Sequence, residues 1–104
     1  MQNYYIWIEA EQWEKSEWNP LDCNSDVFVS FERGAEWVAT FFTYSNISTL
    51  REKNQQSGEC LGGKYFWATN MILVDEINRR NIEEIIKYLV ENKEFENIFN
   101  INDQ

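Results

Sequence analysis

The sequence predicts a single α+β domain over residues 1–104, in which a four-stranded, mostly antiparallel sheet packs with a long C-terminal helix and a shorter middle helix. The chain has the length of one domain, and its 43% hydrophobic and 16% aromatic content separates it from disordered chains. Alternating and apolar runs indicate strands, and one late stretch has the period of a helix. We expect strands at residues 4–13, 26–32, 36–44 and 65–74, and helices at residues 45–56 and from 78 onward.

The first strand is predicted by the alternation of apolar and other residues. Ile6, Ile8 and Ala10 fall on one face, which we expect to enter the core. Residues 14–25 contain the only proline and several turn-forming side chains, so we expect a loop there. The second face of the strand carries large rings beside carboxylates, namely Tyr5, Trp7, Glu9 and Glu11.

The third and fourth strands are predicted by nearly continuous apolar runs. Glu36 to Tyr44 is apolar at almost every position, which is typical of burial on both faces and of a central strand. We expect Gly34 to supply the positive φ that the short connection before this strand requires. Tyr65 to Val74 has the same apolar character. We expect Trp37 and Trp67, one in each strand, to lie in the core.

The two helices are predicted by their caps and their periodicity. Ser45, Asn46 or Ser48 is the expected cap of the middle helix, and Gly58 is expected to end it. Asn78 is the expected cap of the final helix. One stripe of that helix follows the i, i+3, i+4, i+7, i+8 spacing of a buried face, formed by Ile82, Ile85, Ile86, Leu89 and Val90.

Residue types that catalysis needs are scarce in this chain. There is no histidine, which excludes Ser-His-Asp chemistry and imidazole metal sites. Glu9 and Glu11 would lie about 7 Å apart on one strand, but a domain of this size leaves little room for the sugar-sized cleft that paired carboxylates serve. Cys23 and Cys60 form no C-x-x-C pair, and we expect inert thiols, although a disulfide between them is geometrically possible. We therefore expect no enzyme, no cofactor and no metal.

The net charge of −9 is concentrated in the first part of the chain. Residues 1–40 hold eight acidic and two basic side chains, whereas residues 41–104 hold ten and seven. Such a charge repels phosphates, so nucleic acid is not an expected ligand, and a basic protein is the favoured partner. The simpler alternative is a charged face that serves solubility.

Tryptophan is abundant in the same acidic part of the chain. Tryptophan is enriched at binding hot spots, and acidic residues around such an anchor would steer a cationic partner. Burial of these rings in the core is the alternative. The expected partner-binding residues are Glu11, Trp13, Glu14, Glu17, Trp18, Asp22 and Asp26.

Three segments, Phe31–Tyr44, Gly58–Ala68 and Ile72–Ile77, give the chain a general resemblance to small bacterial immunity proteins. Proteins of that group protect cells from polymorphic or contact-dependent growth-inhibition toxins. The resemblance covers residues 26–90 and implies an acidic single domain that binds the toxin's C-terminal domain and blocks its active site. Many such toxins are nucleases with basic surfaces, so the expected function is inhibition of a ribonuclease by an acidic antitoxin surface. No residue role is carried over.

Two other functions stay open at this point. One is a non-catalytic adaptor or mobile-element accessory protein that binds a basic partner, and the other is a carrier or enzyme for a small ligand. No segment has the apolar length of a membrane helix, and Met1 to Ala10 lacks the pattern of a signal peptide. We therefore expect a cytoplasmic protein without membrane contact, a monomer that forms a 1:1 complex with its toxin.

Overall fold

The computed structural model describes residues 3–102 and shows a five-stranded, mostly antiparallel sheet. The strands lie in the order β1-β2-β3-β4, with β4 parallel to β3 and β5 antiparallel to it. The α+β class and the mostly antiparallel sheet are confirmed, but the prediction of four strands is wrong because a short strand follows the last helix. The strands are Tyr4–Ile8 (β1), Asn24–Phe31 (β2), Glu36–Thr43 (β3), Met71–Val74 (β4) and Asn100–Ile101 (β5).

The helices also differ from the prediction in one respect. The middle helix has 14 residues and the C-terminal helix has 13, so the middle helix is not the shorter one. Thr43, two residues before the first predicted candidate, is its N-cap, and its hydroxyl accepts a hydrogen bond from the Asn46 backbone N–H. The helices are Tyr44–Ser57 (α1), Glu59–Gly63 (α2), Arg79–Glu91 (α3) and Phe95–Ile98 (α4), with 3-10 turns at Glu9–Gln12 (η1) and Lys15–Glu17 (η2).

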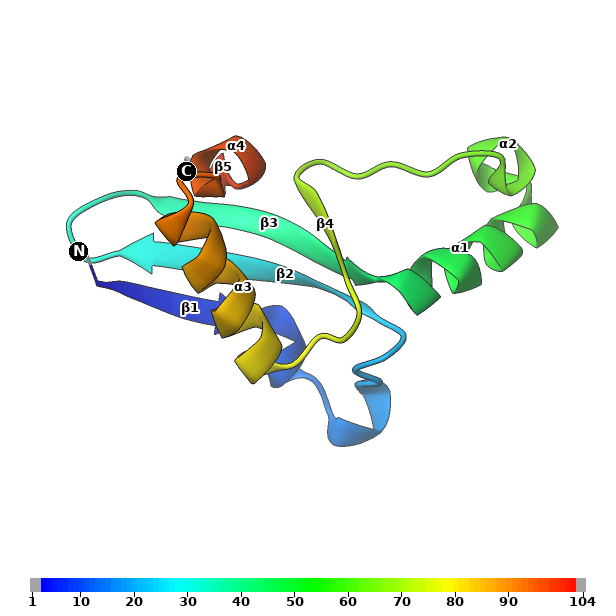
Figure 1. Ribbon diagram of the computed structural model, residues 1–104. Helices are drawn as coiled ribbons and strands as arrows, with labels where there is room; N and C mark the ends of the chain where they lie inside the picture. The colour runs from blue at the N-terminus through cyan, green and yellow to red at the C-terminus, as the bar shows by residue number, and fades with distance from the viewer. Residues whose placement is uncertain (1–2, 103–104) are drawn as a thin grey trace.

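The core lies between one face of the sheet and α3, which Figure 1 shows in front of the strands. Val27 and Phe41 on the sheet and Ile82 and Ile86 on α3 have no exposed surface. Leu89 is also buried, whereas Ile85 and Val90 are half-buried at the edge of the predicted stripe. Asn78 caps α3 as predicted, because its Oδ1 accepts a hydrogen bond from the Asn81 backbone N–H at 2.8 Å. Tertiary burial of one helical face therefore holds the final helix on the sheet.

Two predicted strands are shorter than expected. β1 ends at Ile8, and the chain then turns into η1, where the Ala10 backbone N–H donates to the Ser25 hydroxyl at 2.9 Å. β4 begins only at Met71, because Asn70 has a φ of 53° and its side chain donates to the Ile98 carbonyl at 2.7 Å. The expected burial of Trp67 is therefore wrong, since 68% of its surface is exposed.

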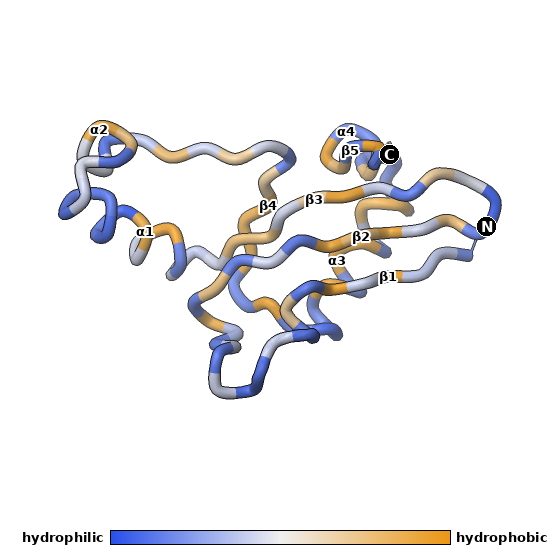
Figure 2. The backbone as a smooth tube through the Cα atoms, turned by 180° about the vertical axis from the view of Figure 1, so that it is seen from behind, coloured by the Kyte–Doolittle hydropathy of each residue, from blue (hydrophilic) through white to orange (hydrophobic). Residues whose placement is uncertain are grey.

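β3 is central, as predicted, since it pairs with β2, β4 and β5. The positive φ expected at Gly34, in the connection before β3, is wrong, since the glycines with a positive φ are Gly58, Gly62 and Gly63. Burial on both of its faces holds only at its C-terminal end. Ala39 and Phe41 are buried on the helix-covered face, while Val38 and Thr40 on the other face are half-buried. Seen from behind, no helix covers β1, β2 and β3 among the residues that the structure describes (Figure 2).

Residues 44–70, which we call the arm, project from one end of the sheet (Figures 1 and 2). The molecule is consequently elongated, with extents of 47 × 28 × 27 Å. Gly58 ends α1 with a φ of 86°, as predicted, and the chain folds back through a left-handed turn. A Cβ on Gly63 would lie 2.8 Å from the Arg51 carbonyl oxygen, so this turn packs directly on α1. Between residues 3 and 102, no helix combines the length and apolarity needed to cross a membrane.

Candidate functional site

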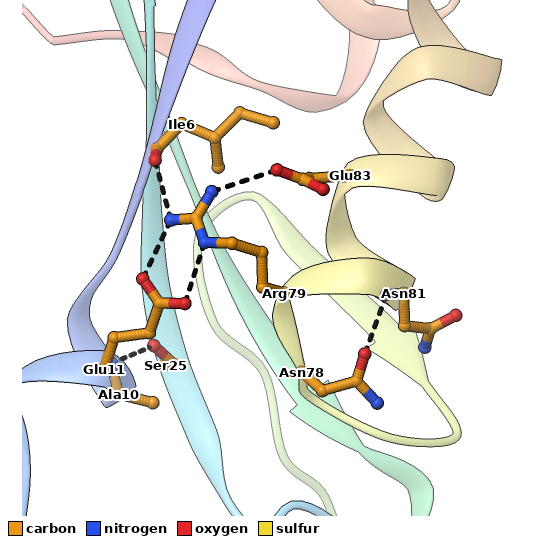
Figure 3. A network of polar contacts seen from close by, with 8 residues as sticks. All are labelled: Ile6, Ala10, Glu11, Ser25, Asn78, Arg79, Asn81 and Glu83. Atoms are coloured by element: carbon orange, nitrogen blue, oxygen red, sulfur yellow. Dashed lines mark hydrogen bonds and ion pairs between the residues drawn. The ribbon is translucent and has the colours of Figure 1, made fainter.

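The acidic residues expected to bind a partner are largely engaged within the protein. Glu11 forms a two-pronged ion pair with Arg79, with both N–O distances 2.8 Å (Figure 3). Arg79 also donates to the Ile6 carbonyl at 2.9 Å and to Glu83 at 3.2 Å. The hydrogen bonds from Arg79 lower the pKa of Glu11. This carboxylate therefore connects η1 to α3, and its charge is matched internally.

Asp22 holds the arm against the loop that precedes β2. Its Oδ1 accepts a hydrogen bond from Asn46 at 3.0 Å, and its Oδ2 accepts one from Thr49 at 2.7 Å. The bonds from Asn46 and then Thr49 lower the pKa of Asp22. Asn24 donates to the Asn46 side chain at 3.0 Å, which completes the anchor of α1. Asp22 is thus tied to the position of the arm.

The other expected contact residues are divided between the surface and the interior. Glu14 and Glu17 are exposed in the segment around η2, where the Glu17 carboxylate accepts from the Glu14 backbone N–H at 3.3 Å. Trp13 and Trp18 are partly buried and pack against the core. The buried Nε1 of Trp18 has no hydrogen-bond acceptor within residues 3–102. Nearby, burial raises the pKa of the Cys23 thiol. The seven expected residues therefore differ in exposure, and Glu11 and Asp22 are held by contacts within the protein.

A different surface has the character of a binding site. The strand register places Tyr5, Trp7, Asp26, Phe28, Glu36, Val38, Thr40, Met71 and Leu73 on the sheet face opposite to α3, and we call this set the open face. Tyr5 is 69% exposed and Leu73 is 41% exposed. Trp7 is 37% exposed and meets Phe28 edge-on, with the ring centroids 5.5 Å apart. Large rings therefore form a preformed patch on a rigid sheet.

The charge of the open face has one sign. Asp26 and Glu36 lie at its strand positions, and no Lys or Arg does. Thr40 donates to Asp26 at 2.7 Å, and Ser30 and Asn102 donate to Glu36 at 3.1 and 2.7 Å. These bonds fix the carboxylates beside the aromatic patch. The arrangement suits a guanidinium or ammonium group, which can stack on an aromatic ring and pair with a carboxylate.

Sequence reasoning found only part of the open face. The alternation in the first strand correctly separates Tyr5 and Trp7 from Ile6 and Ile8. Asp26 of β2 was among the expected contact residues, but the other contributions of β2 and those of β3 were missed, because the chain pattern alone does not give the register that places Phe28 beside Trp7. The continuous apolar run of the third predicted strand indicated burial on both faces, so its half-buried face was not predicted.

Another hollow of the surface is mainly apolar. This groove, of about 560 Å³, lies between the β2–β3 turn and the α3–α4 corner, and its lining includes Phe31, Trp37, Val90 and Phe95. Within residues 3–102, no three Cys, Asp or Glu side chains gather in a way that could hold a metal ion. The groove therefore offers mainly apolar contact, with the charged side chains of Lys93 and Glu96 also in its lining.

Comparison with protein families, with characterised proteins and with solved structures finds no match to this chain.

Proposed function

We propose that this chain is a non-enzymatic binding domain that recognises a basic protein, and that it acts as an immunity protein against a toxin nuclease, most simply a ribonuclease. The observation that supports this function is the open face, where Trp7 and Tyr5 are exposed beside the hydrogen-bonded carboxylates of Asp26 and Glu36. Aromatic residues provide the desolvated anchors of protein interfaces, and acidic residues increase the rate of encounter with a cationic surface.

In this proposal, the partner binds through arginine or lysine side chains that would otherwise hold nucleic acid phosphates. Phosphate-binding surfaces of nucleases are cationic, so an acidic face can occupy the same groups. The open face replaces the loop around Glu14 and Glu17 as the centre of the contact. Those two carboxylates, exposed at the neighbouring end of the sheet, would contribute long-range attraction. The complex is a 1:1 heterodimer formed in the cytoplasm.

The decisive test uses the protein encoded beside this gene, expressed as its C-terminal domain. We expect co-expression to protect cells from growth arrest, and the purified pair to bind with an affinity that falls as the salt concentration rises. Trp7→Ala combined with Asp26→Asn should weaken binding by about 100-fold or more, as hot-spot substitutions do. Tyr88→Ala, at a 62% exposed position on α3, is the matched control and should not change binding.

Three results would change or contradict this proposal. Loss of binding in Glu14→Gln/Glu17→Gln but not in Trp7→Ala/Asp26→Asn would move the interface to the η2 segment. Binding without growth protection would favour the adaptor function. Absence of binding together with absence of protection would contradict the proposed function.

A further inference from the structure

The arm is chemically distinct from the body of this acidic protein. Residues 44–70 contain three basic side chains and two acidic ones, whereas residues 3–43 and 71–102 contain six basic and fifteen acidic ones. The basic residues of the arm are Arg51, Lys53 and Lys64, and all three are exposed. A slightly cationic element thus projects from a strongly anionic body.

The turn at the far end of the arm and the segment that returns from it to the body expose large apolar side chains. Leu61 is 72% exposed, Tyr65 is 52% exposed and Trp67 is 68% exposed. Three such residues within seven positions form a patch of the kind that folded monomers seldom leave in water. The left-handed turn packs on α1, and the returning segment packs on Phe42 through Phe66, so binding there costs little ordering.

The arm leaves the body on the side of the open face. Phe66, in its returning segment, packs edge-on against Phe42 with ring centroids 5.4 Å apart. Phe42 alternates with Val38 and Thr40 and therefore shares their side of β3. A groove of about 340 Å³ beside it joins the two surfaces, since Met71 and Leu73 of the open face line it together with Arg51, Lys64 and Phe66. The arm and the open face thus lie on the same side of the molecule. In a two-fold dimer each copy can then place its arm on the open face of the other.

We propose that the free protein forms a two-fold dimer in which the arm of each copy lies on the open face of the other. Charge selects this geometry, because arm and body attract while two bodies repel. Length permits it, because the 14 residues of α1 span about 21 Å and an eight-residue strand spans about 27 Å. Trp67 then meets the exposed rings of Tyr5 and Trp7, and the arm cations meet Asp26 and Glu36.

The dimer forms without any partner protein, but it affects how the proposed partner would bind. The arm of one copy covers the same rings that a basic partner would contact. The dimer is therefore a resting form, and the monomers separate when the partner binds. Free chains pair with one another, and bound chains form the 1:1 complex.

Sedimentation velocity of the full chain, from about 1 to 200 µM, tests the dimer without any partner. We expect a concentration-dependent monomer–dimer equilibrium that shifts toward monomer when sodium chloride rises from 50 to 500 mM. Trp67→Ala and Arg51→Glu/Lys64→Glu should each weaken association by about ten-fold or more. Tyr88→Ala on α3 is the control and should leave it unchanged.

Mixing two defective variants tests whether the arm of one copy binds the open face of the other. A Trp67→Ala chain keeps an intact open face, and a Trp7→Ala chain keeps an intact arm, so a mixture should form heterodimers with one complete contact. Association in the mixture should exceed that of either variant alone. A chain that stays monomeric over the whole range, or a dimer that Trp67→Ala does not weaken, overturns the proposal. Neither result bears on whether a basic partner binds.

Discussion

Arg79 and Glu11 meet side by side, with Nε–Oε2 and Nη2–Oε1 distances of 2.8 Å (Figure 3). The pair joins the first residue of α3 to the turn that follows β1, although the two residues are 68 positions apart. Arg79 also donates to the Ile6 carbonyl, a backbone group on the unpaired side of edge strand β1. One guanidinium therefore fixes the helix to the sheet and covers part of an exposed strand edge.

The first prediction concerns this ion pair. Glu11→Gln should lower the free energy of unfolding by about 0.5–1.5 kcal/mol, because the bonds are charge-assisted but partly exposed to water. Urea denaturation measures the change. Glu84→Gln, at an exposed position of α3, is the control and should stay within about 0.5 kcal/mol of the unchanged protein. Equal losses in the two variants would show that the pair contributes only general charge.

The second prediction concerns the pH dependence of stability. The pKa values of Glu11 and Asp22 are lowered in the folded state, so the unfolded chain binds more protons between the folded and unfolded values. Their contribution is fully present above the ordinary carboxyl pKa of about 4 and is lost as the pH falls through the folded values. Urea denaturation from pH 7 downward should show this loss. A Glu11→Gln/Asp22→Asn chain should show a shallower decline, and an unchanged slope would contradict the prediction.

At alkaline pH, the stability of the folded state should fall as the pH rises. Burial raises the pKa values of Tyr4 and Cys23 above their ordinary values. Their contributions are present below the unfolded values and are lost as the pH rises through the folded ones. Since the chain has no histidine, stability should be nearly flat between about pH 6 and 8 and should fall only above about pH 9. A pronounced change between pH 6 and 8 would contradict this.

The third prediction concerns the core between α3 and the sheet. Ile86→Ala should lower the free energy of unfolding by about 2–5 kcal/mol, because Ile86 has no exposed surface and its truncation leaves a cavity. Tyr88→Ala, two residues later on the same helix but 62% exposed, should change it by less than about 0.5 kcal/mol. Chemical denaturation of both variants gives the comparison. Similar losses would show that α3 does not pack by the face described here.

The fourth prediction concerns the turn after α3. Lys93 has a φ of 58°, a conformation that costs a residue with a side chain about 1 kcal/mol relative to glycine. Lys93→Gly should therefore stabilise the protein by up to about 1 kcal/mol. Lys87→Gly, inside α3, should destabilise it by about 1 kcal/mol. The two variants lose the same charge, so opposite signs in thermal or urea unfolding isolate the backbone effect.

Local patterns in the sequence determine much of this fold. The helical stripe from Ile82 to Val90, the Asn78 cap and the Gly58 stop are written in neighbouring residues, and all three are found. The alternation of Ile6 and Ile8 with Tyr5 and Trp7 likewise separates the buried face of β1 from its exposed face. These features depend on contacts within one turn or one strand, so residue type and spacing are enough to predict them.

Tertiary structure alone decided the features that join distant parts of the chain. The position of Asn70, held by the Ile98 carbonyl, shortens β4 and leaves Trp67 exposed in a segment that reads as a buried strand. Arg79 and Asn46 engage Glu11 and Asp22, two acids that the sequence offers as contact residues. The register of β1 and β2 brings Phe28 to Trp7. Each outcome depends on a contact with a residue far away in the sequence. The type and spacing of neighbouring residues do not specify which distant group a charged or apolar side chain will contact.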